Sequence, residues 1–382
     1  MTVQFDNATL HWVRVSPKTC WCFVQLRMRD GRIGQGEATL NNREDAVAAA
    51  AAVFVPQALA QATPERPGDF AAERVPANLA EAAVISALDQ ALWELHALGQ
   101  NAPLAQALAG GKPRDAIGVY ANINRRTLDR SPAGFAASAQ VALAAGHAAF
   151  KMAPFDELNT MLCAQGQGER AMQPGLARIA AVRAAVGPDA RLMVDCHWRF
   201  DEPSAMQLIT AAASMGLYWI ECPLPEVHAN IAALARLRDH ASALGVRQAG
   251  LEECIRWEAF RPYCEAGAYD VVMPDVKYVG GMAEMLRLAQ TCARLGVQVS
   301  PHNPSGPICH AASLQLASRL EGFDLMELQF DESPLFDALV SGAFGSVRRG
   351  STNLPSANGL GVKLDPVLLQ AHAARPALVW KA

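Results

Sequence analysis

The stretch Arg191–Arg199 reads RLMVDCHWR, an apolar run that ends abruptly in polar residues. Its Leu-Met-Val core is typical of a short parallel strand that is buried on both faces. Asp195, His197 and Arg199 then occupy alternate positions. Parallel α/β folds place their chemistry just past the carboxyl ends of such strands, although one strand with a polar turn would mean little by itself. The pattern gains weight because the chain repeats it.

Apolar runs that end in polar residues recur through the middle of the chain. Two earlier runs, Ile117–Tyr120 and Ala149–Met152, alternate with helical patterns over Ser131–Ala145 and Leu176–Val186. From the opening stretch onward the polar ends lie 23 to 31 residues apart, at Asp195, Glu221, Glu252, Asp275, His302 and Glu327. That spacing is the length of one strand–helix unit, and eight such strands close into a parallel barrel. Right-handed connections then place every strand end on one rim, and an open, doubly wound sheet is the alternative.

The first part of the chain has a different pattern. Cys22–Arg29 alternates apolar and polar residues and is followed by Ile33–Glu37, which predicts an antiparallel hairpin. Arg43–Ala62 is rich in alanine, and Leu79–Leu98 carries an apolar stripe at helical spacing. We therefore expect a small α+β domain over residues 1–115.

Two further features set the predicted domain limits. Gly110–Pro113 is a run of turn-forming residues, and it separates the α+β domain from a barrel over residues 116–335. After the barrel, residues 342–361 are rich in Gly, Ser, Asn and Pro. We expect the segment 336–382 to return to the N-terminal domain. A chain of 382 residues is long for one ordinary domain, in agreement with this division.

Composition restricts the class of protein. Hydrophobic residues make up 51% of the chain and charged residues 18%, an ordinary balance for a globular protein. The net charge is −4 and basic residues do not cluster, so we expect no nucleic-acid partner. No apolar run approaches the roughly 20 residues of a membrane span and the N-terminus lacks a signal-peptide core, so we expect no membrane association. The nine cysteines are scattered without a CxxC pair, which favours reduced thiols in the cytoplasm.

Three successive predicted strands end in carboxylates, at Asp195, Glu221 and Glu252. Carboxylate oxygens are the ligands that Mg²⁺ prefers in proteins. A single acidic residue at a strand end is more often a loop residue or a helix cap, but three in consecutive units predict a metal site. Glu253 follows Glu252 directly, and only one of the two can point toward the barrel axis, so the third ligand stays open between them.

The next two polar ends, Asp275 and His302, lie on neighbouring predicted strands. A carboxylate beside an imidazole fixes its tautomer and raises its basicity, as a general base requires. Prolines at 301 and 304 hold the loop of His302 at a strand end. His197 is a second candidate, because it lies two residues beyond the predicted metal ligand Asp195.

In this order the motifs resemble the enolase superfamily, in its mandelate racemase subgroup, and the resemblance covers essentially the whole chain. The motifs are Asp195, Glu221-Cys-Pro, Glu252, Pro-Asp275, Pro301-His302-Asn303-Pro304 and Glu327, with Gly34–Ala38 similar to the capping domain of that group. The resemblance implies an α+β capping domain over a modified TIM barrel of (β/α)7β type. It also implies one Mg²⁺ on Asp195, Glu221 and Glu252. Finally, it implies an Asp275/His302 base and Glu327 as a hydrogen-bond donor to the substrate carboxylate.

One departure from the subgroup narrows the function. Residues 150–154 read FKMAP, so Lys151 is followed by Ala153 where racemases of the subgroup carry a second, basic lysine. Without it, racemisation by two bases loses one of them. Two roles are open for Lys151. It either pairs with the substrate carboxylate or is a lysine at a strand end that reaches solvent. Asp195–Arg199 resembles the D-x-H-x-R motif of acid-sugar dehydratases of the D-galactonate dehydratase type, which implies that His197 protonates the departing hydroxyl.

The sequence therefore predicts a Mg²⁺-dependent lyase that dehydrates an acid sugar, either an aldonate or an aldarate, to a 2-keto-3-deoxy acid. One alternative is a racemase or epimerase that uses His302 with Lys151. Another is a non-catalytic metal-binding family member, although no base or ligand is missing. A lactonising enzyme of the muconate group would carry a lysine in place of Asp275.

We expect a small-molecule sugar acid as the partner and a homo-oligomer, because large barrel enzymes are often symmetric assemblies. Loops of the capping domain, Val15–Trp21 and Asn41–Arg43, are expected to set specificity. No motif in the sequence identifies which sugar acid they accept.

Overall fold

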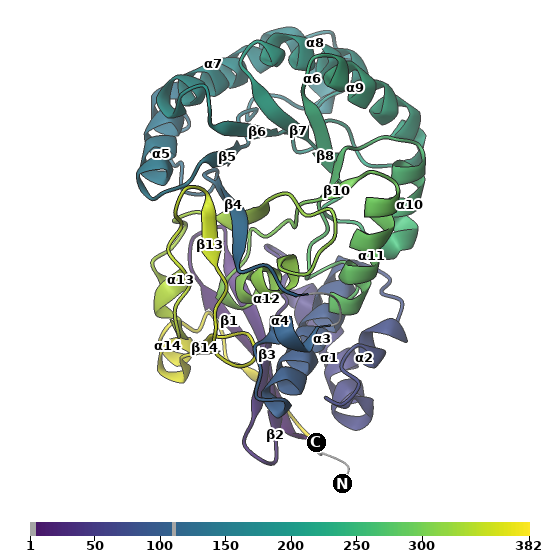
Figure 1. Cartoon of the computed structure of the whole chain (residues 1–382), viewed down its shortest axis with the longest axis vertical. Coiled ribbons are helices and arrows are strands. Elements are labelled where there is room, and N and C mark those ends of the chain that lie inside the picture. Colours follow the sequence, from purple (N-terminus) through teal and green to yellow (C-terminus); the bar gives the residue numbers. More distant parts are fainter. Residues whose placement is uncertain (1–4, 109–111) are drawn as a thin grey trace.

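The computed structural model describes residues 5–108 and 112–382. It consists of an N-terminal part with its own antiparallel sheet and a ring of parallel strands surrounded by helices (Figure 1). Gly110 and Gly111, where the sequence predicts the boundary between the two, lie outside the described residues.

In the N-terminal part, β1 (Phe5–Arg14), β2 (Cys20–Met28) and β3 (Ile33–Glu37) form an antiparallel sheet beside α1 (Glu44–Gln61), α2 (Asp69–Ala72) and α3 (Leu79–Gly99). Helix α3 packs directly on β3, and this close approach explains two glycines. A Cβ at Gly34 would lie 2.1 Å from the carbonyl oxygen of Ala91, and one at Gly36 would lie 1.9 Å from that of Ala87. The GQGE stretch thus lets backbone and helix come together.

The parallel sheet has the order β10-β9-β8-β7-β6-β5-β4-β11, with neighbouring strands in parallel register. A parallel bridge between Val299 and Phe323 and a hydrogen bond from Ser300 Oγ to the carbonyl of Leu325 (2.6 Å) link its two ends. The curled parallel sheet confirms the predicted fold class. Its strands are β4 (Ala116–Asn122), β5 (Ala149–Met152), β6 (Arg191–Asp195), β7 (Leu217–Glu221), β8 (Arg247–Gly250), β9 (Val271–Val272), β10 (Gln298–Val299) and β11 (Met326–Gln329).

Helices cover the outside of this ring (Figure 1). Several begin at side-chain caps: Ser131 accepts from the N–H of Gly134 and Asp201 from that of Ser204. Helix α4 (Leu104–Ala107) precedes β4 and packs against α3 and α12. The helices that follow β4 are α5 (Pro132–Ala144), α6 (Thr160–Ala164), α7 (Gly168–Val186), α8 (Glu202–Ala213), the 3₁₀ turn η1 (His228–Asn230), α9 (Ile231–Ala243), α10 (Arg256–Glu265), α11 (Met282–Arg294) and α12 (Pro307–Ala317).

The C-terminal segment contacts both parts of the molecule. Strand β13 pairs antiparallel with β4, and β15 pairs with β1, so the chain ends beside its own beginning (Figure 1). The elements are α13 (Leu335–Ala338), β12 (Val340–Ser341), β13 (Ser351–Asn353), β14 (Lys363–Leu364), α14 (Pro366–Ala371) and β15 (Leu378–Lys381). The domain limits at residues 115 and 335 stay a prediction.

The structure also bears on the cysteines and on the apolar helices. All nine cysteines are free thiols. Among the described residues, no helix combines the length and the apolar character that a membrane crossing needs.

Candidate active site

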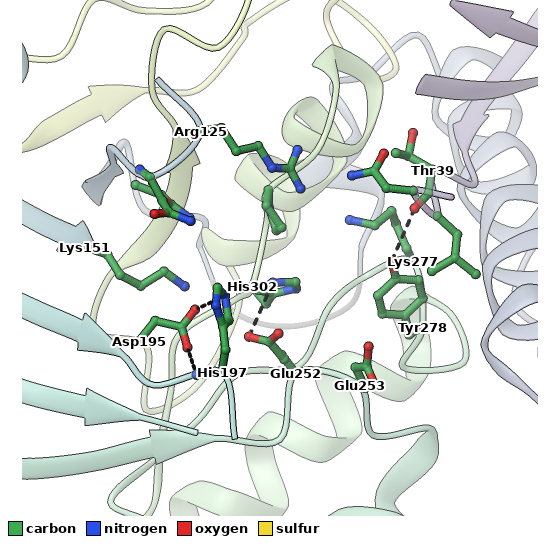
Figure 2. A pocket seen from close by; sticks show the side chains of 15 residues that line it. Thr39, Arg125, Lys151, Asp195, His197, Glu252, Glu253, Lys277, Tyr278 and His302 are labelled. Atoms are coloured by element: carbon green, nitrogen blue, oxygen red, sulfur yellow. Dashed lines mark hydrogen bonds and ion pairs between the residues drawn. The ribbon is translucent and has the colours of Figure 1, made fainter. Parts of the chain in front are cut away.

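A cavity of about 330 Å³ lies at the carboxyl ends of the barrel strands, and residues of the loop that follows β3 form part of its wall (Figure 2). Side chains from both parts of the chain line it. They are Thr39, Leu40, Asn41, Asn122, Asn124, Arg125, Lys151, Asp195, His197, Glu252, Glu253, Lys277, Tyr278, His302 and Pro304. Of the two capping loops expected to set specificity, the second contributes Asn41. None of the described residues Val15–Trp21 lines the cavity.

The three predicted metal ligands come together. Asp195 and Glu221 end β6 and β7 and are register partners in the parallel sheet. Glu252 follows β8, and one carboxylate oxygen from each of the three residues lies within 4.8 Å of the others. All three side chains are buried, whereas Glu253 is exposed and lies outside the cluster. The geometry therefore favours Glu252 over Glu253 as the third ligand.

The backbone turns sharply where these strands end. His197, Cys222 and Leu251, each next to or near a predicted ligand, have positive φ angles of 47°, 46° and 73°. Such left-handed conformations cost free energy in residues with a side chain and tend to occur at functional sites. The N–H of Leu251 donates to Glu226 Oε1 at 2.7 Å, and Glu226 is a partly buried carboxylate that the sequence did not point to.

The donor set fits a hard divalent cation. Glu252 Oε2 is buried and has no hydrogen-bond partner among the described residues. Burial, together with the charges of Asp195 and Glu221, raises the pKa of Glu252 well above its usual range. A cation placed among these oxygens would satisfy the orphaned atom and relieve the repulsion, and all-oxygen ligation suits Mg²⁺.

Lys151 lies beside this cluster. Its Nζ is 2.6 Å from Glu221 Oε1 and 2.9 Å from Glu327 Oε1, and its side chain is 2% exposed. Burial alone would lower the pKa of Lys151, but the two carboxylates raise it well above its usual range. The interpretation of Lys151 as a strand-end lysine that reaches solvent is therefore wrong.

The predicted base is assembled as an imidazole–carboxylate pair. His302 Nδ1 lies 2.8 Å from Asp275 Oδ2, while Nε2 faces the cavity, 3.5 Å from Glu252 Oε2. Lys277, which the sequence reasoning left aside, places Nζ 2.8 Å from Asp275 Oδ2 and is buried. Burial alone would raise the pKa of Asp275, but Lys277 and His302 lower it. The ionised Asp275 accepts from Nδ1, which leaves Nε2 as the atom that can take a proton.

Glu327 accepts hydrogen bonds from Asn122 Nδ2 (2.6 Å) and the N–H of Asn303 (2.9 Å), in addition to its ion pair with Lys151. Burial would raise the pKa of Glu327, but Lys151 and His302 lower it. In this structure Glu327 is thus an acceptor. The role implied for it, as a donor to the substrate carboxylate, stays a prediction.

His197 faces the other side of the cluster. Its Nε2 lies 2.8 Å from Asp195 Oδ2, and the ring is 38% exposed at the cavity wall (Figure 2). The charge of Asp195 raises the pKa of His197 above its usual range. A raised pKa is the direction of shift that a general acid requires, and the role of His197 as that acid stays a prediction.

Comparisons with known proteins agree with this geometry. A family model described as "Enolase C-terminal domain-like" matches residues 134–368, and one for the mandelate racemase/muconate lactonizing enzyme N-terminal domain matches residues 6–109. D-gluconate dehydratase of Thermoproteus tenax is 30% identical over 92% of this chain and 70% of its own. D-galactonate dehydratase of Ralstonia nicotianae is 28% identical over 96% of this chain and 94% of its own.

Solved structures share the fold over almost the full length. A mandelate racemase/muconate lactonizing enzyme from Jannaschia sp. CCS1 superposes with a TM-score of 0.81 at 24% identity, with 98% of both chains covered. An enolase superfamily member from Salmonella Typhimurium gives a TM-score of 0.83 at 21% identity, with 99% of this chain and 100% of that chain covered. The chain belongs to the enolase superfamily, in its mandelate racemase/muconate lactonizing enzyme family.

Proposed function

We propose that the protein is a Mg²⁺-dependent acid-sugar dehydratase. It removes the proton α to a carboxylate, eliminates the β-hydroxyl and forms a 2-keto-3-deoxy acid. The observation that carries this proposal is the position of His302 Nε2, which faces the cavity 3.5 Å from Glu252 Oε2 in the cluster of three buried carboxylates. Curated relatives named D-gluconate and D-galactonate dehydratase support the same reaction class.

Asp195, Glu221 and Glu252 would hold the metal ion. When bound, the ion supplies positive charge that stabilises a substrate carboxylate as it gains a second negative charge. Lys151 adds a fixed positive charge at the same side of the cavity, because Glu221 and Glu327 hold its ammonium in place.

The proton transfers fall to the two histidines. His302 Nε2 takes the α-proton, and Asp275 keeps the ring in the required tautomer and stabilises it once protonated. Hydroxide leaves poorly unless it is protonated, and His197, with its raised pKa, is the group proposed to supply that proton. Water and the 2-keto-3-deoxy acid are the products, so the elimination consumes no oxidant or reductant.

The contacts of Lys151 argue against the racemase alternative. A second base would have to accept a proton, but the Lys151 ammonium is held by two carboxylates, and Ala153 offers no replacement. A non-catalytic family member would lack a base or a metal ligand. Asp195, Glu252 and His302 line the cavity, and Glu221 lies in the same carboxylate cluster, which speaks against that alternative.

A screen of aldonic and aldaric acids for 2-keto acid formation tests the proposal. We expect at least one acid to yield a 2-keto-3-deoxy product, with activity lost in EDTA and restored by Mg²⁺. Accumulation of an epimer without loss of water would show a racemase instead. Full activity in exhaustively chelated protein would exclude the metal-dependent mechanism.

A further inference from the structure

Arg125 lines the cavity, but the carboxylate that pairs with it lies outside the proposed catalytic machinery, unlike the partners of Lys151 and Lys277. Lys151 and Lys277 are both paired with carboxylates of the proposed catalytic machinery. The partner of Arg125 is Glu332, which does not line the cavity. Figure 2 shows the Arg125 guanidinium on the opposite side of the cavity from Asp195 and Glu252. Its positive charge therefore faces the cavity without an acidic partner there.

Arg125 is held by one edge only. Its Nη1 lies 3.0 Å from Glu332 Oε2, and the other carboxylate oxygen of Glu332 accepts from Thr19 Oγ1 and Ser16 Oγ (3.4 Å). Nε and Nη2 of Arg125 make no hydrogen bond with any residue that the structure describes. The guanidinium side chain is 26% exposed, against 6% for Glu332. The result is a planar group anchored through Nη1, with two nitrogen atoms, Nε and Nη2, available to donate to a ligand.

Neutral polar groups also line the cavity. Asn41 and Thr39, from the loop after β3, line the cavity, and Asn41 Oδ1 is buried without a partner among the described residues. An unpaired amide oxygen suits a hydroxyl donor, such as those along a sugar chain. Asn124, next to Arg125 in sequence, also lines the cavity. The cavity thus offers carboxylate chemistry at one end, hydroxyl partners along its wall and a cation at the other end.

We propose that Arg125 binds a second carboxylate at the far end of the substrate, so that the acid sugar is an aldarate rather than an aldonate. The inference rests on the proposed dehydratase function and names its substrate class. Two parallel N–H donors on a planar guanidinium match the two oxygens of a carboxylate, which makes such pairs both strong and selective. A terminal hydroxymethyl group, as in an aldonate, would leave this charge unpaired.

The same contacts assign a role to the first capping loop. Ser16 and Thr19 do not line the cavity, but they hold Glu332, and Glu332 holds Arg125. The loop Val15–Trp21 therefore acts on specificity by positioning Arg125 and not by touching the substrate.

Kinetics on matched substrates test this assignment. The acids are an aldarate, the aldonate of the same configuration and its 6-phosphate, each assayed for 2-keto product with Mg²⁺ present. We expect the native enzyme to prefer the aldarate in kcat/KM. Arg125→Ala should reduce the aldarate-to-aldonate preference on the order of 10- to 100-fold, mainly through KM, because a charge-assisted hydrogen-bonded pair is lost.

Arg126→Ala is the matched control. Arg126 joins the same two loops through an ion pair with Asp331 (2.8 Å) and is 24% exposed, but it does not line the cavity. It should keep the native preference. Arg125→Lys retains the charge without the planar fork, and we expect an intermediate preference.

Three results would overturn the assignment. The native enzyme could use the aldonate as well as the aldarate, or it could prefer the phosphorylated acid. Arg125→Ala could also lower activity on both acids equally, together with thermal stability, which would make the pair with Glu332 purely structural. If no acid sugar is dehydrated at all, the proposed function itself fails, and that result is distinct from the other three.

Discussion

At the residue scale, two carboxylates that are adjacent in sequence differ in burial and in their distance from the predicted metal site. Glu252 belongs to the acidic cluster, whereas Glu253 is exposed at the cavity edge. Mutation of a residue that only hydrogen-bonds to a metal ligand typically weakens metal binding by roughly 10- to 100-fold. We expect a larger loss of Mg²⁺ affinity for Glu252→Gln, because this change removes a ligand itself. Glu253→Gln should leave the affinity nearly unchanged. Isothermal titration with Mg²⁺ measures both, and equal losses would remove the distinction that the geometry draws.

Variants of the two cavity histidines, His302 and His197, should lose different steps of the reaction. His302→Asn removes the proposed base, so both turnover and exchange of the α-proton with deuterated solvent should fall by about 10²- to 10⁴-fold. His197→Asn should fail on the natural hydroxy acid but still release fluoride from a 3-deoxy-3-fluoro analogue, because fluoride leaves with little proton assistance. If both variants lose fluoride release equally while Mg²⁺ binding is intact, His197 is not the acid.

Side chains at strand ends could be predicted from the sequence, but their partners could not. Asp195, Glu221 and His302 follow apolar runs, and this local signal is sufficient to mark them. Glu226 and Arg125 act through contacts with residues 25 and 207 positions away, at Leu251 and Glu332. No spacing rule links such pairs, because the fold alone brings them together.

At the element scale, a buried acidic residue joins the two parts of the molecule. Glu37, at the end of β3, accepts the N–H groups of Gly306 (2.7 Å) and Cys309 (2.9 Å) at the start of α12. A carboxylate there satisfies free helix donors and opposes the positive end of the helix dipole. Helix α12 follows the loop that carries His302, so this contact also fixes the position of the base.

We expect Glu37→Ala to destabilise the protein by about 2 to 4 kcal/mol, because a cap is lost and buried donors are left unpaired. Urea unfolding monitored by circular dichroism measures the change. Glu81→Ala is the control: Glu81 also accepts a backbone N–H near a helix start, from Ala77, but it is only partly buried. A Glu37 variant no less stable than the Glu81 variant would show that the contact between β3 and α12 contributes little.

At this scale, helices and strands with a clear hydrophobic periodicity in the sequence could be predicted. Elements that are stabilised by residues distant in sequence could not. Leu79–Leu98 coincides with α3 to within a residue. Helix α7 begins at Gly168, well before the predicted Leu176. The prediction is wrong because Pro174 and Gly175 usually mark the end of a helix, whereas here they lie inside it. A Cβ at Gly175 would lie 2.2 Å from the ring of Phe155, so tertiary packing accounts for that glycine. The short strands β13 and β15 exist only through pairing with β4 and β1.

At the scale of the whole molecule, buried acids distant from the cavity set a dependence of stability on pH. Burial raises the pKa of Glu94 to about 8, although hydrogen bonds from Gln35 partly offset the effect. Burial likewise raises the pKa of Asp89 to about 7, against an opposing hydrogen bond from the N–H of Met282. Both groups lie on α3. Glu94 accepts hydrogen bonds from Gln35 in β3, whereas Asp89 accepts from Met282 at the start of α11.

The sign of the effect follows from proton binding. Between pH 4.5 and about 8 the folded protein keeps the Glu94 proton, while the unfolded chain releases it. Stability therefore falls as pH rises through this window. Glu94→Gln keeps a hydrogen-bonding group but cannot ionise, so its free energy of unfolding should fall less between pH 5 and pH 8. Since each unit of pKa shift corresponds to about 1.4 kcal/mol, the difference should reach at most a few kcal/mol.

Urea unfolding at pH 5, 6.5 and 8 measures this difference. All other titrating groups, including the acidic cluster, are common to both proteins and cancel in the comparison. Glu81 is a partly exposed acid on the same helix, and Glu81→Gln should follow the native curve. Parallel curves for the native protein and Glu94→Gln would mean that Glu94 is ionised in the fold. Gln35 and the neighbouring backbone would then stabilise the buried charge, and Glu94 would not contribute to the dependence of stability on pH.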